Sequence, residues 1–244
     1  MNNNYRKLGL GLVIAGGLFA PISYFVINSV LLTAVGISSI MIGFTSIALA
    51  NTRPFISPEA CQLILKTGME NTAALLEELG LTTKAIYLPS SMREGHAQAV
   101  IPLIDTNNHD WVRKKIPGRL IVRYGTNPDD MAISVTTPGS INIDLLENKP
   151  GPTSGEIEAA ASYILTGVLD IASSVSVNME DGLLDIQIKG SAFSYEDIWY
   201  YRCLGSPIAS IVAAISSEAL GKPVRIREEA FSKGTSQITL EVLD

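Results

Sequence analysis

Few side chains in this sequence have the types and spacing that catalysis or metal binding requires. The 244 residues include two histidines, His96 and His109, and neither lies in a metalloprotease-type or triad-like context. Asp129 and Asp130 form a carboxylate pair of the kind used in acid–base chemistry, but adjacent acidic residues after Asn-Pro are typical of a turn. No glycine-rich phosphate motif follows a strand-like segment. We therefore expect no catalytic residue, no metal and no cofactor.

A basic cluster with one tryptophan is the first candidate for binding. The segment "HDWVRKKIPGR" brings together Trp111, Arg113, Lys114 and Lys115 in a chain that is acidic overall. An exposed indole beside cations suits the lipid headgroup layer or a phosphorylated ligand. The alternative is a solvated loop whose tryptophan folds back onto the core.

An aromatic cluster is the second candidate. The segment "SYEDIWYYRCLG" contains Tyr195, Trp199 and Tyr200, and concentrated aromatic residues of this kind line pockets and interfaces. We predict that these three residues, together with Glu228 from the C-terminal strands, bind a ligand or a partner. An ordinary core seam beneath a helix is the alternative.

The residues that precede these clusters predict a membrane hairpin. No Asp, Glu, Lys or Arg occurs from Leu8 to Thr52, which is about twice the roughly 20 residues that one spanning helix needs. A polar break at 27–29 divides this segment into spans at about 8–27 and 30–50. A cleaved secretory signal is the alternative, but a second apolar segment of equal length argues against it. The lipid bilayer is the expected partner of residues 1–52.

Charge predicts the orientation and excludes one class of partner. Arg6 and Lys7 precede the first span and Arg53 follows the second, so both termini and the soluble part should face the cytoplasm of the cell. The net charge of the chain is −6, and residues 57–244 contain 15 basic and 24 acidic residues, a net charge of −9. An acidic surface disfavours nucleic-acid binding.

The soluble part predicts an α+β fold. A helix followed by two strand-like segments occurs at 57–104, at 154–190 and at 206–243, with "EDG" as a hairpin turn and Ser57 and Ser154 as helix N-caps. Antiparallel hairpins with amphipathic helices on one face are the expected architecture. The Pro- and Gly-rich stretch near 150 suggests two units, 53–150 and 151–244, or one continuous domain.

Two resemblances add to this prediction. The hairpin, the "SPE" helix start, "AIYLPSSMREGHAQAVIPL" and "TTPGSINIDLLE" resemble a family of archaeal membrane proteins with a cytoplasmic domain of unknown function. The tail "VRIREEAFSKGTSQITLEV" is similar to the end of 4-vinyl-reductase-like small-molecule-binding domains, with Glu228 or Glu229 and Gly234 at the matching positions. That family commonly has cysteines where this chain has Ala230 and Ser236, so the resemblance implies a sensory-domain shape without a metal or thiol role.

Three functions follow, in descending order of support. The first is a non-enzymatic, membrane-anchored domain that acts through an unknown protein partner or through self-association. The second is a small-molecule-sensing domain tethered to the membrane, whose pocket contains the aromatic cluster. The third is a membrane enzyme that acts on a lipid-derived substrate through His96, Asp110 and Arg113.

Overall fold

The structure is a computed structural model that describes residues 4–52, 58–95, 98–104, 115–124, 130–146, 148–191 and 198–243. Its contacts divide the chain into two compact units, Met1–Lys66 and Thr67–Asp244. The second unit contains the sheet and is α+β, as the sequence predicts.

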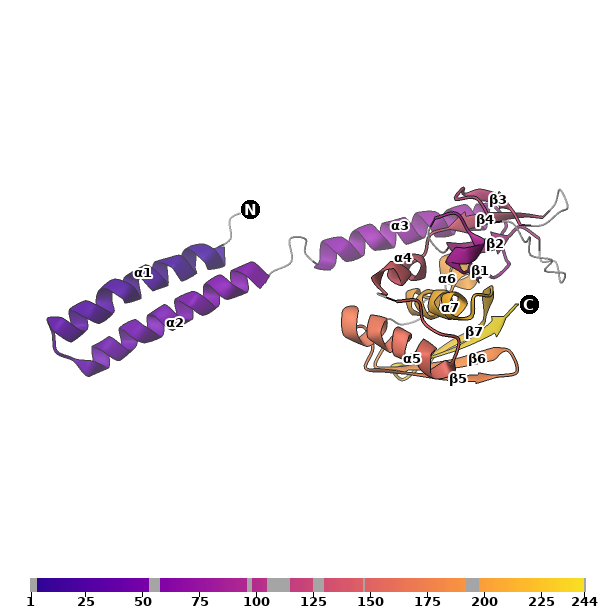
Figure 1. Cartoon of the computed structure of the whole chain (residues 1–244). Coiled ribbons are helices and arrows are strands. Elements are labelled where there is room, and N and C mark those ends of the chain that lie inside the picture. The colour runs from indigo at the N-terminus through magenta and orange to yellow at the C-terminus, as the bar shows by residue number, and fades with distance from the viewer. Residues whose placement is uncertain are drawn as a thin grey trace. The chain divides into compact units, whose positions relative to one another are not determined.

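The first unit contains two long apolar helices, α1 (Asn4–Phe25) and α2 (Val30–Thr52), which lie side by side (Figure 1). Both are long and apolar enough to span a membrane, which confirms the predicted pair of apolar helices. Small residues bring the two backbones together: a Cβ added to Gly36 would lie 2.8 Å from Cβ of Ala20. The apolar stretch Trp199–Leu220 also passes the same length and composition test, but it is 89% buried and belongs to the core of the second unit.

Helix α3 (Pro58–Glu78) follows, and its second half contributes to the second unit. Ala73 and Leu76 are buried in the main core. The helix ends just before Gly80, whose φ of 65° is a backbone conformation that glycine adopts without steric cost. The predicted stop at Gly80 is confirmed.

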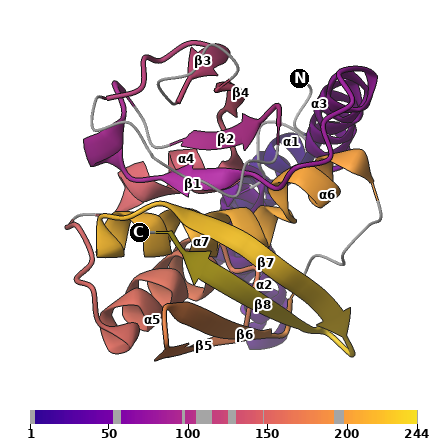
Figure 2. The same cartoon turned by 90° about the vertical axis from the view of Figure 1, so that its right-hand side faces the viewer.

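The sheet has eight strands in the order β3-β4-β2-β1-β7-β8-β6-β5, and every neighbouring pair is antiparallel (Figure 2). Strands from both predicted soluble segments therefore share one sheet, and the β1–β7 pair joins them. The strands are β1 (Ile86–Leu88), β2 (Gln98–Pro102), β3 (Ile121–Arg123), β4 (Met131–Val135), β5 (Ser174–Glu180), β6 (Leu183–Lys189), β7 (Val224–Ser232) and β8 (Thr235–Val242).

Helices cover one face of this sheet. They are α4 (Pro138–Asn142), α5 (Ser154–Ser162), α6 (Trp199–Leu204) and α7 (Pro207–Leu220), with short 3₁₀ segments η1 (Ser90–Met92) and η2 (Ile143–Leu145) and a π-type continuation of α5, η3 (Tyr163–Val168). Helix α7 is buried along residues 208–219 because α4 and α5 flank it and the sheet lies beneath it. Ser206 is its N-cap. The N-cap predicted for the first helix of the soluble part, Ser57, lies outside the described residues. The predicted cap of α5 is wrong by one residue: Thr153, not Ser154, forms a reciprocal capping box with Glu156.

A second, smaller core lies on the opposite face of the sheet. Its buried side chains include Ile86, Val100, Val122 and Ala132 from the first four strands. The alternation of side chains along a strand separates these residues from Tyr87, Ala99 and Ile133 of the main core. Strands β1, β2 and β4 thus bury side chains on both faces, whereas β3 buries only Val122 and β5–β8 present a polar face to solvent.

Candidate functional site

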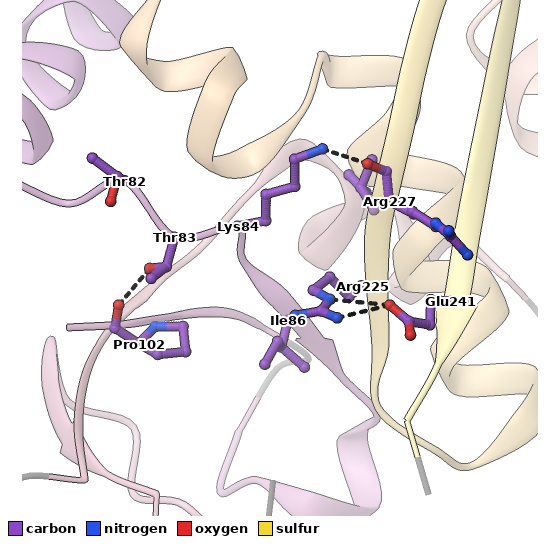
Figure 3. Close-up of a pocket in the computed structure, with 9 residues that line it drawn as sticks. Thr82, Thr83, Lys84, Ile86, Pro102, Arg225, Arg227 and Glu241 are labelled. Atoms are coloured by element: carbon purple, nitrogen blue, oxygen red, sulfur yellow. Dashed lines mark hydrogen bonds and ion pairs between the residues drawn. The ribbon is translucent and has the colours of Figure 1, made fainter. Parts of the chain in front are cut away.

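The two halves of the sheet are joined by a short pairing between β1 and β7, and a groove lies beside the unpaired part of β7. Strand β1 has three residues and β7 has nine, and they pair only through Ile86 with Arg225 and Tyr87 with Val224. The chain before Ile86 diverges from β7 and leaves a cavity of about 500 Å³ (Figure 3). Its lining comprises Thr82, Thr83, Lys84, Ile86, Pro102, Arg225, Ile226, Arg227 and Glu241.

Three cations and one carboxylate line this groove, and their partners differ. Arg225 donates to Oε2 of Glu241 from Nε at 3.2 Å and from Nη2 at 2.8 Å, so its charge is neutralised. Nζ of Lys84 donates to the backbone carbonyl of Arg227 (Figure 3). The guanidinium of Arg227 is exposed and makes no ion pair with any described residue. Lys84 and Arg227 therefore both lack an ion pair with a described residue, and of the two only Arg227 also lacks a side-chain hydrogen bond to one.

A β-bulge places Arg227 in this position. Ile226 pairs with Leu240 and Glu228 pairs with Thr239, so Arg227 is an extra residue in β7. The bulge reverses the alternation of side chains beyond it. Glu229 consequently turns toward the helices, where Oε2 accepts from the backbone N of Ser206 at 3.0 Å. Glu228 shares the solvent face with Thr239 and is exposed.

The pKa of the Lys84 ammonium is lowered by its surroundings in the groove. Partial burial of its side chain in the groove lowers the pKa of the ammonium, and Arg225 lowers it further. Glu228 and Glu229 oppose the shift without cancelling it. A lysine with a lowered pKa in a cavity is a candidate functional group, although structural networks produce similar shifts.

The sequence of the chain matches a known protein family over almost its whole length. A model of one protein family matches residues 1–242. The chain belongs to this family, which is described as a domain of unknown function (DUF7982). The DUF7982 match includes the two apolar helices as well as the sheet, so the hairpin is part of the family's own domain. No curated protein and no solved structure matches the chain.

The structure of this DUF7982 chain disperses the predicted aromatic site. Trp199 and Tyr200 belong to α6, where Nε1 of Trp199 donates to the carbonyl of Leu81 at 2.8 Å. Tyr200 is buried, and burial, with a smaller effect of Tyr201, raises the pKa of its hydroxyl to about 12. Both residues pack on the main core, whereas Glu228 lies on the solvent face of the sheet. Tyr195 lies outside the described residues. A binding role for these residues stays a prediction.

Most of the other sequence candidates also lie outside the described residues: Trp111, Arg113, Lys114, His96, His109, Asp110 and Asp129. Lys115 is described and exposed. Within the described ranges, no three His, Cys, Asp or Glu side chains are grouped as metal ligands. Sequence reasoning missed Lys84 and Glu241, because only the β1–β7 and β7–β8 pairings bring them to the arginines of β7. The alternation of Arg225 and Arg227 on a wet strand face was the available signal.

Two buried charged side chains outside the groove connect distant segments of the second unit. Glu218 of α7 accepts from N and Oγ of Ser90, both at 2.7 Å, and lies 3.4 Å from Nζ of Lys149. Arg93 is 1% exposed and donates to Oγ of Ser134, while its Nε and Nη2 have no partner among the described residues. Burial lowers the pKa of Arg93 to about 10. These contacts tie the segment after β1 to α7 and to β4.

Proposed function

We propose that this protein is a non-enzymatic, membrane-anchored domain that recruits a partner protein by binding an extended segment of it along β7. The observation that carries the proposal is the incomplete pairing of β7. Its residues 226–232 have no neighbouring strand on the β1 side among the described residues. An open strand edge is a template for another chain, and strand addition is a common mode of peptide recognition.

The hydrogen-bonding state of this edge supports the proposal. The carbonyl of Arg227 already accepts a hydrogen bond from the β1 side, but the donor is the ammonium of Lys84 and not a backbone amide. The lysine thus occupies the place that an N–H group of an added strand would take. Glu228, Ala230 and Ser232 of this stretch are exposed.

The lining of the groove indicates the chemistry of the segment. Small-molecule sites are mostly apolar, whereas six of the nine residues here are Thr, Lys, Arg or Glu. Arg225 is neutralised by Glu241, so Arg227 is the cation available for a new partner. We infer that the bound segment is extended and carries a carboxylate or phosphate that meets Arg227.

The test uses the full-length protein in lipid nanodiscs and a phage-displayed library of alternating polar and apolar peptides. A selected peptide is synthesised, and its affinity is measured by fluorescence anisotropy. Arg227→Glu should weaken binding by more than about tenfold, which corresponds to about 1.4 kcal/mol. The matched control is Arg123→Glu, an exposed arginine on the edge strand β3, which should have little effect. Failure to select any peptide, or equal loss in both variants, would refute the proposal.

A second candidate, sensing of a small anion, is favoured by the volume of the groove. About 500 Å³ lies within the usual range of small-molecule sites, and three cations line it. Inorganic phosphate is the probe: if it raises the melting temperature of the protein while no peptide binds, sensing replaces recruitment.

We also propose that both termini and the sheet domain face the cytoplasm. The support is the positive charge of Arg6, Lys7 and Arg53 at the outer ends of the two apolar helices. Reporter fusions active only in the cytoplasm, placed at each terminus, should both give signal. Signal from neither terminus would reverse the orientation.

A further inference from the structure

We propose that the first turns of α3, around residues 63–66, lie in the surface layer of a bilayer, an inference that rests on the membrane anchoring through the apolar hairpin proposed above. Ile64 is 68% exposed and Leu65 is 65% exposed, although both are large and apolar. The same helix buries Leu76 completely only three turns later. The exposed apolar residues therefore belong to a part of α3 that the protein core does not cover.

The spacing of these residues indicates what covers them. Successive helix positions differ by about 100°, so the consecutive apolar side chains Leu63, Ile64 and Leu65 span an arc of about 200°. One partner helix covers a narrow stripe at positions i, i+3, i+4 and i+7, which cannot include three consecutive residues. An apolar medium covers such an arc, and the headgroup–acyl boundary of a lipid bilayer is a medium of this kind.

The length of the chain permits this placement. Helix α2 ends at Thr52 and α3 begins at Pro58, so the connection reaches at most about 20 Å. Position 64 lies only about 9 Å further along the helix axis.

The test places an environment-sensitive fluorophore at position 64 of the full-length protein. Ile64→Cys is labelled with a nitrobenzoxadiazole dye in a Cys61→Ser background, because Cys203 is 3% exposed and protected from the reagent. The control label replaces Glu78, an exposed residue at the far end of the same helix. Protein is compared in phosphatidylcholine vesicles with and without doxyl-labelled lipid.

We expect blue-shifted emission and strong quenching by doxyl lipid at position 64, with neither effect at position 78. A second label at Leu65→Cys should behave like position 64, which guards against one badly folded variant. Absence of quenching at both 64 and 65 would overturn the inference. Energy transfer between labels on different copies, without lipid quenching, would assign the surface to a second copy and would also overturn it.

Discussion

Replacement of Glu218 by glutamine should destabilise the sheet domain by about 2 kcal/mol. The carboxylate accepts two hydrogen bonds from Ser90, one from N and one from Oγ, each 2.7 Å long. Hydrogen bonds to a charged group contribute about 1.5–3 kcal/mol each, and neutral ones about 1 kcal/mol. Glutamine keeps one oxygen acceptor without charge, and the relief of burying a carboxylate offsets part of the loss. The ion pair with the half-exposed Lys149 adds less than about 1 kcal/mol.

The stability difference between wild type and Glu218→Gln should depend on pH, whereas a simple packing defect would give the same difference at every pH. Burial raises the pKa of Glu218, but the two hydrogen bonds from Ser90 and the charge of Lys149 outweigh burial, and the pKa lies below its ordinary value. A carboxyl group with a lowered folded-state pKa stabilises the protein above its unfolded pKa of about 4.3. This stabilisation is lost as the pH falls through the lower folded-state value, so wild type and Glu218→Gln should converge there.

The assay is urea unfolding of the full chain in nanodiscs, followed by tryptophan fluorescence at neutral and acidic pH. Urea unfolding measures the expected loss of about 2 kcal/mol directly. In thermal unfolding of the same samples, this loss corresponds to a fall in melting temperature of about 4–8 °C for a domain of this size. The matched control is Glu77→Gln, which removes the same charge from an exposed position on α3. Equal destabilisation in both variants, or a difference for Glu218→Gln that persists at low pH, would refute the reasoning.

Three further changes test other parts of the fold. Gly36→Leu should separate α1 from α2, because a Cβ at Gly36 would lie within 2.9 Å of the facing backbone. The matched control is Gly17→Leu, since a Cβ at Gly17 has no neighbour within 4 Å, and energy transfer between one dye on α1 and one on α2 measures the separation. Glu229→Gln should reduce the free energy of urea unfolding by about 1 kcal/mol through the lost contact with the α7 cap, and Glu228→Gln should change it by less than about 0.5 kcal/mol. Arg93→Met should leave that free energy unchanged or raise it, because two buried donors of Arg93 have no described partner; a loss above about 1 kcal/mol would contradict this expectation.

Local pattern was sufficient to predict much of this molecule. The uncharged stretch before Thr52 predicts two apolar helices, since apolar length is read from composition alone. The "EDG" turn predicts the β5–β6 hairpin, and the apolar segment that begins at Ser206 predicts a helix where α7 lies, because turns and helix periodicity depend on residues close together in the chain. For the same reason, the α+β class follows from the order of helices and hairpins.

The groove depends on contacts between segments that are distant in the chain, and the sequence does not predict it. Lys84 reaches the carbonyl of Arg227, 143 positions later, because three-residue β1 pairs with the start of nine-residue β7. The bulge at Arg227 turns Glu229, and not Glu228, toward the helices. Alternating polarity indicates that a strand has two faces, but the register against the partner strand determines which residue is the unpaired one in a bulge. Pairing between distant strands is a property of the whole sheet, and it determines which of two adjacent glutamates accepts the hydrogen bond from the N-cap residue of α7.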